Sequence, residues 1–166
     1  MSKIKIVDNF LDEKNFGYLQ EAMTSAWFAW FFNDHVTFKG EDHLINNFQF
    51  THAFFANNEK SNQFPLLEPI LRKINYIGLV RIKANLGTRT EKPVEHGFHV
   101  DYDTPTLTTA IFYVNDNNGC TKFINGQKVQ SKANRYVEFN SQELHTGVSQ
   151  TDTKARIAIN FNFIKR

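Results

Sequence analysis

The strongest constraint on the fold is a two-residue alternation of apolar and polar side chains from Gly78 to the end of the chain. This period is typical of strands with one buried face and one polar face. Turn residues interrupt it, and Asn125-Gly126 is the strongest short signal for a hairpin. About seven or eight strands are therefore expected, at spacings that suit a sandwich or barrel. The main runs are 79–85, 107–114, 121–124, 127–130, 135–139, 144–148 and 155–164.

The first part of the chain contains two amphipathic helical patterns. One begins at Asp12, a good N-cap, and continues to about Ser25 with apolar residues at helical spacing. The other has Pro65 in its first turn and ends near Asn75. Residues 3–7 alternate and indicate a short strand before the first helix. We expect both helices to cover a sheet.

Between the two helices the signals are mixed. The aromatic run Trp27 to Phe32 favours a strand buried on both faces, and 48–55 fits either a strand or a helix. The histidines His35, His43 and His52 lie here without an acidic residue two positions on, so ordinary packing is the preferred interpretation of each, with His52 the best candidate for chemistry.

These patterns predict a mainly β fold with N-terminal helices, a double-stranded β-helix (jelly roll) with two covering helices. The length of 166 residues and the hydrophobic fraction of 41% suit one domain, 1–166, with a single core. Within it, we expect 1–77 to form the helical cover and edge strands and 78–166 to form the β-barrel core.

Charge and cysteine content exclude several classes of protein. The net charge of +2 comes from residues spread along the chain, so no basic block indicates nucleic acid or a membrane surface. The only cysteine, Cys120, cannot form an intrachain disulfide, and no apolar run is long enough to span a membrane. With no signal peptide at the start, the expected location is the cytoplasm, in a bacterium or a phage-infected cell.

A cluster of ionisable residues stands out in the stretch Glu95 to Asp103. If this stretch is a strand, His99 and Asp101 project from one face and could bind one metal ion, with His145 as the third ligand. Two histidines and one carboxylate form the facial triad of non-haem Fe(II), which leaves three open coordination positions. Zinc more often requires a closed tetrahedral set.

The last strand offers a cation to such a site. Alternation places Arg156, Ala158, Asn160 and Asn162 on one face of 155–164 and apolar residues on the other. The polar row could face solvent, but lining a polar cavity is the favoured interpretation, because an arginine there suits bidentate binding of a carboxylate.

Together these residues resemble the Fe(II)- and 2-oxoglutarate-dependent dioxygenases, specifically the small single-domain members of the prolyl 4-hydroxylase-like branch in bacteria and phages. The similarity covers about 63–164 and is poor before it. The segment Thr109 to Phe123 is similar to the family's "YLN … GGxTxF" segment, except that Cys120 replaces the second glycine.

The resemblance implies an enzyme that binds Fe(II), 2-oxoglutarate and O₂, with ascorbate as a candidate reductant. It would hydroxylate a C–H bond and release succinate and CO₂. It implies His99, Asp101 and His145 as metal ligands, with the cosubstrate bound by Arg156, Tyr113, Lys83 and Asn160.

The resemblance also bears on the substrate. It favours a prolyl or other peptide residue, with a free amino acid or other small molecule as the alternative. Nucleic acid is disfavoured, because Asn162 stands where a nucleic-acid demethylase has a second arginine. His96 and Asp103 are expected beside the metal site or at its entrance. The expected oligomeric state is a monomer or a weak homodimer. A rival interpretation is a jelly-roll binding module without catalysis.

Overall fold

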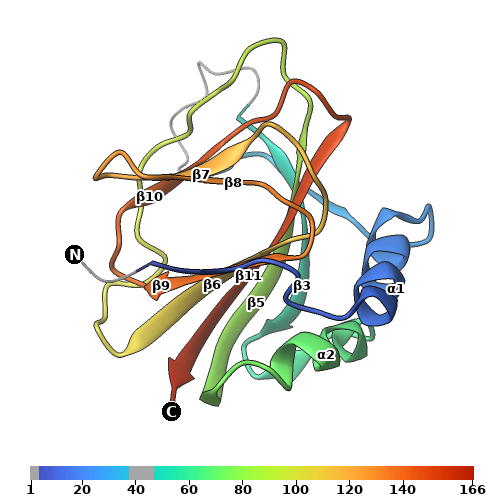
Figure 1. The fold of residues 1–166 in the computed structure, drawn as a ribbon, viewed down its shortest axis with the longest axis vertical. Helices are drawn as coiled ribbons and strands as arrows, with labels where there is room; N and C mark the ends of the chain where they lie inside the picture. Colours follow the sequence, from blue (N-terminus) through green and yellow to red (C-terminus); the bar gives the residue numbers. More distant parts are fainter. Residues whose placement is uncertain (1–3, 38–46) are drawn as a thin grey trace.

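The protein is described by a computed structural model covering residues 4–37 and 47–166, so His43 lies outside the described residues. Two antiparallel sheets form most of it (Figure 1). The larger sheet has the order β1 (Lys5–Val7), β9 (Arg135–Asn140), β6 (Leu107–Tyr113), β11 (Ala155–Lys165), β5 (Tyr76–Thr88), β3 (Gln49–Ala56) and β2 (Phe31–Asn33), and β4 (Glu59–Lys60) pairs with β3. The smaller sheet has the order β10 (His145–Val148), β7 (Cys120–Phe123) and β8 (Lys128–Gln130).

From β5 onward the chain passes repeatedly between the two sheets, which is the path of a jelly roll. The strands β5, β6, β9 and β11 belong to the larger sheet, and β7, β8 and β10 belong to the smaller one. Between β5 and β6 the chain is bridged to β10 through the pairs Glu95–Val148 and His99–His145. Apart from the stretch around His99, the predicted strands of this half, including the hairpin with Gly126 at φ 86°, are confirmed.

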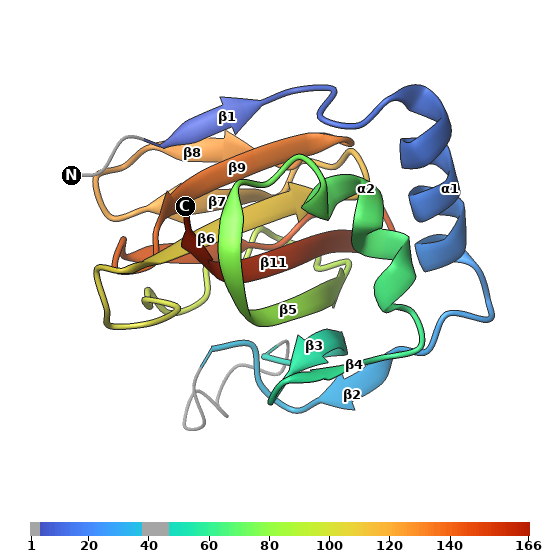
Figure 2. The same cartoon turned by 90° about the horizontal axis from the view of Figure 1, so that it is seen from below.

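Two apolar cores occupy the two faces of the larger sheet. The core between the sheets includes Phe123 and Val137. The other core packs Phe161 of β11 against Leu19 and Met23 of α1 (Glu13–Thr24) and Ile70 of α2 (Glu68–Leu71). Both helices lie outside the larger sheet, on the side away from β7 and β8 (Figures 1 and 2). No helix of the described residues is long and apolar enough to cross a membrane.

The first predicted helix is confirmed, but the second is broken. The Asp12 carboxylate accepts the backbone N–H of Asn15 and so caps α1. The segment starting at Pro65 instead forms a 3₁₀ helix, η1 (Phe64–Leu67), followed by the single turn of α2. Pro69, which has no backbone N–H and a fixed φ, lies within the run and is tolerated only at a helix start.

The prediction of a doubly buried strand over Trp27 to Phe32 is wrong. Only Phe31–Asn33 forms a strand, β2, at the edge of the larger sheet. Trp27 is 93% exposed and Phe32 is 65% exposed, whereas Phe28 is buried against Phe54. As an edge strand, β2 pairs with a neighbouring strand along one side only, so its faces are less covered than those of a central strand. Aromatic density alone therefore did not predict burial. The ambiguous residues 48–55 form strand β3.

Candidate functional site

Two histidines and one aspartate come together between the two sheets. One ligand atom each from His99, Asp101 and His145 lies within 4.8 Å of the other two. His99 and His145 exchange backbone hydrogen bonds of 3.0 Å in both directions, which sets their rings 4.6 Å apart. The expected strand around His99 is wrong, since this stretch contributes only a single bridge and Asp101 lies in a bend.

Each imidazole is oriented by a carbonyl of its own segment. Nδ1 of His99 lies 3.2 Å from the Gly97 carbonyl oxygen, and Nδ1 of His145 lies 2.8 Å from that of Glu143. A carbonyl only accepts, so Nδ1 carries a proton, and in the neutral tautomer the lone pair is then on Nε2. Burial lowers the pKa of His145, against the opposing effect of Asp101. A ring that carries its proton on Nδ1 can bind a metal ion through the Nε2 lone pair.

One carboxylate oxygen of Asp101 is held by hydrogen bonds, and the other lies near His99. Its Oδ2 accepts hydrogen bonds from Thr109 Oγ1 at 3.0 Å and Asn162 Nδ2 at 2.8 Å. Its Oδ1 lies 3.8 Å from His99 Nε2. The side chain is only 4% exposed, and burial alone would raise its pKa, but His145, Asn162, Arg81 and His99 together keep the pKa below its usual value. The carboxylate is therefore anionic, and its Oδ1 is available to bind a metal ion.

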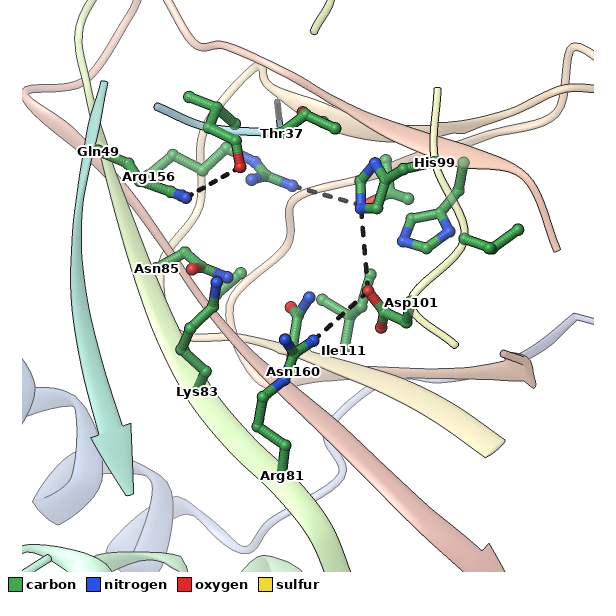
Figure 3. Close-up of a pocket in the computed structure, with 16 residues that line it drawn as sticks. Thr37, Gln49, Arg81, Lys83, Asn85, His99, Asp101, Ile111, Arg156 and Asn160 are labelled. Carbon is green, nitrogen blue, oxygen red and sulfur yellow. Dashed lines mark hydrogen bonds and ion pairs between the residues drawn. The ribbon is translucent and has the colours of Figure 1, made fainter. Parts of the chain in front are cut away.

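A cavity of about 250 Å³ opens from these three residues along β5 and β11 (Figure 3). Arg156 lies at one end, opposite Gly87 in the strand register. Its Nε donates to Ser131 Oγ at 2.8 Å, and its Nη2 lies 3.4 Å from Thr121 Oγ1. This fixed guanidinium can bind a carboxylate with its remaining N–H groups.

The other predicted cosubstrate residues differ in position. Lys83 and Asn160 face each other across β5 and β11 and both line the cavity. Burial and the nearby Arg81 lower the pKa of Lys83, while Asp101 raises it. Tyr113 is fully buried behind the cavity wall, and its hydroxyl donates to Thr121 Oγ1 at 2.6 Å. It reaches Arg156 by stacking, with 5.5 Å between the guanidinium carbon and the ring centre.

Among the described residues, the other histidines (His35, His52 and His96) and Asp103 do not line this cavity. His52 is buried between the Ala29 carbonyl and the Ser61 hydroxyl, at 2.9 and 3.1 Å, so its role is structural. His35 contacts Asp34. The Asp103 carboxylate is exposed and accepts a hydrogen bond from Gln142. His96 does not line the cavity that holds the three clustered residues, but it lines a smaller one beside Arg156.

Three-dimensional comparison finds similar solved structures over nearly the whole chain. The epimerase SnoN, in complex with Fe³⁺, α-ketoglutarate and a nogalamycin, has 14% identity and a TM-score of 0.69 over 99% of this chain and 79% of that one. A prolyl hydroxylase from Trichoplax adhaerens, bound to a hypoxia-inducible-factor peptide, has 12% identity and a TM-score of 0.64, with coverage of 98% and 83%. HygX from Streptomyces hygroscopicus, bound to nickel, 2-oxoglutarate and hygromycin B, has 10% identity and a TM-score of 0.61, with coverage of 99% and 83%.

This chain has the fold of the 2-oxoglutarate-dependent non-haem iron oxygenases. No family model matches the sequence, and no curated protein matches it either. The similarity is thus one of structure, at identities where sequence comparison fails.

The sequence placed Asn162 on the polar face of the last strand, but it did not reveal that a row of side chains on three strands surrounds Asp101. Thr109 on β6, Asn162 on β11 and Arg81 on β5 are direct register partners, and all three approach Asp101. The two-residue alternation of a strand could have indicated Arg81, which lies two positions before Lys83 on the same face. The register between strands distant in sequence could not be read from the sequence.

Proposed function

We propose that residues 1–166 form a single Fe(II)- and 2-oxoglutarate-dependent dioxygenase domain that hydroxylates a substrate C–H bond. The carrying observation is the convergence of His99, Asp101 and His145 at one end of a cavity that also contains a fixed arginine. The fold supports this assignment, because its structural relatives include proteins solved with iron or nickel and with 2-oxoglutarate.

The donor set fits the metal. Two free Nε2 atoms and one carboxylate oxygen match the facial triad, and the absence of a thiolate or a fourth ligand among the described residues argues against a structural zinc site. When bound, Fe(II) with 2-oxoglutarate and O₂ supplies the oxidising chemistry, with ascorbate as a candidate reductant.

The protein's own residues would bind and orient the cosubstrate. Arg156, braced by Ser131 and Thr121, would bind the carboxylate farthest from the metal. Lys83 and Asn160, midway along the cavity, would contact the cosubstrate on its way to the metal. Tyr113 would support Arg156 from behind, since its hydroxyl is already bonded to Thr121.

The leading substrate is a prolyl or other residue in a peptide, by analogy with the Trichoplax relative, whose structure contains a peptide. A free amino acid or other small molecule is the second candidate, favoured by the charge of the cavity wall, where Arg81, Lys83 and Arg156 outnumber Asp101. Nucleic acid is not proposed, because Asn162 is used to hold Asp101.

The decisive experiment is anaerobic titration of the protein with Fe(II) and 2-oxoglutarate. Formation of the chelate gives a weak visible charge-transfer band, and succinate release on addition of O₂ reports turnover. His145→Ala should abolish both signals, whereas the matched variant His35→Ala should retain them, because the His35 side chain pairs with Asp34 and does not line the cavity. A wild-type protein without the band, or an active His145→Ala variant, would contradict the proposal.

A further inference from the structure

Arg81 lies at a different end of the cavity from Arg156, the residue proposed to bind the cosubstrate. Along β5 the cavity-facing residues are Arg81, Lys83 and Asn85, and along β11 the residue opposite Arg81 is Asn162, whereas Arg156 is opposite Gly87. Six positions of strand separate Arg81 from Gly87, about 20 Å of backbone at ~3.4 Å per residue. Figure 3 shows Arg81 and Arg156 entering the cavity from different ends, with Asp101 near Arg81.

The guanidinium of Arg81 is oriented but only partly used. Its Nε donates to Asn162 Oδ1 at 3.1 Å, and its carbon lies 5.4 Å from the centre of the Tyr102 ring. Its Nη2 is 3.7 Å from Asp101 Oδ1, beyond hydrogen-bonding distance. Among the described residues, neither Nη atom has a hydrogen-bond acceptor, so the outer edge of the fork can bind a carboxylate. With 30% of the side chain exposed, it is accessible from solvent.

Charge balance supports an anion at this place. Three basic residues (Arg81, Lys83 and Arg156) and one acidic residue (Asp101) line the cavity among the described residues, a formal sum of +2. A divalent ion and doubly negative 2-oxoglutarate cancel each other and leave that excess unchanged. Unbalanced charge in a partly desolvated cavity is unfavourable, and an anionic substrate would neutralise it.

We infer that Arg81 is a substrate-binding residue that recognises a carboxylate of the primary substrate; this rests on the proposed dioxygenase function. The carboxylate belongs either to a free amino acid or to an acidic peptide. A carboxylate oxygen binds a small divalent ion at about 2.1 Å. Since Nη2 is 3.7 Å from Asp101 Oδ1, an ion bound to that oxygen would lie no more than about 6 Å from Nη2. The oxidised carbon is therefore within a few bonds of the carboxylate.

The test uses the protein with Zn(II) and N-oxalylglycine, an unreactive 2-oxoglutarate analogue, and measures binding by calorimetry. The probes are the standard amino acids as free acids, the same compounds as C-terminal amides, and capped tripeptides with or without an aspartate or glutamate. Binding is expected only from members with a carboxylate. The amide of a binding acid should bind about tenfold more weakly or worse, the effect of losing a charge-assisted contact. Free acids and acidic tripeptides distinguish the two sources.

Variants separate substrate recognition from support of Asp101. Arg81→Gln should weaken the binding acid about tenfold while the affinity for N-oxalylglycine stays within about twofold. Arg89→Gln is the matched control, since Arg89 is exposed just after β5. Amides that bind as well as acids, a panel without binding acids, or an Arg81→Gln variant that loses only metal and analogue binding would each overturn the inference. Failure of the wild-type protein to bind Zn(II) and N-oxalylglycine would instead overturn the proposed function beneath it.

Discussion

Removing the Thr109 hydroxyl should weaken metal binding without disturbing the fold. Thr109 is fully buried, and its Oγ1 supplies one of the two hydrogen bonds that Asp101 Oδ2 accepts, the other coming from Asn162. A hydrogen bond to a charged group contributes about 1.5–3 kcal/mol. Loss of a residue that orients a metal ligand typically costs about 10–100-fold in affinity. Thr109→Val keeps the shape of the side chain, so we expect a loss of metal affinity in that range.

The measurement is Fe(II) affinity under anaerobic conditions by competition with a chelator, with urea unfolding monitored in parallel. Thr108→Val is the matched control, because Thr108 is the preceding residue of β6 and so points to the opposite face, away from Asp101. Wild-type affinity in Thr109→Val, or an equal loss in Thr108→Val, would refute the role given to this hydrogen bond.

Two further predictions concern stability. Phe28→Ala should lower the free energy of unfolding by about 3–5 kcal/mol, because this ring is buried. Trp27→Ala should lower it by no more than about 0.5 kcal/mol, because this ring is 93% exposed. Urea unfolding of both variants tests this difference, and equal losses would contradict it. The hydrogen bond from Arg135 lowers the pKa of Asp8 from 3.8 to about 2. The ionised carboxylate thus stabilises the fold above pH 3.8, and this contribution is lost as the pH falls through 2. Solvent screening keeps it below about 1 kcal/mol, and Asp8→Asn should flatten the fall in stability over that interval in pH-dependent thermal unfolding.

The sequence predicted the elements whose pattern is local. In 155–164 the alternation separates Ile157, Ile159, Phe161 and Phe163, which lie in the helix-side core, from Arg156 and Asn160 on the cavity wall. The N-cap at Asp12 is likewise a short-range effect. These features depend on neighbours within a few residues, so they are visible in the printed letters.

What failed depended on contacts between distant segments. His99 and Asp101 were expected to share the face of a strand, but they are brought together by one bridge to His145, 46 residues away (145 − 99), and by a bend. The anchoring of Asp101 by Thr109 and Asn162 follows from the pairing of β6 with β11, and sheet register is set by the whole fold. The sequence alone could indicate candidate metal ligands, but it could not identify the residues that hydrogen-bond to them.

Gly119, in the loop before β7, lies close to Arg156. A Cβ at this position would lie 2.9 Å from Arg156 Cδ and 2.8 Å from the backbone oxygen of Val148, closer than real Cβ contacts. The backbone oxygen cannot move away as a flexible side chain can, so Gly119→Ala should cost about 1–3 kcal/mol by overpacking and displace the guanidinium. We expect weaker 2-oxoglutarate binding, measured by titration of the charge-transfer band, together with lower stability. Gly17→Ala in α1 has nothing within 4 Å of the added Cβ and should stabilise the protein by about 0.5–1 kcal/mol. If Gly119→Ala instead binds 2-oxoglutarate like the wild type, the close approach of Arg156 to this glycine does not set the position of the guanidinium.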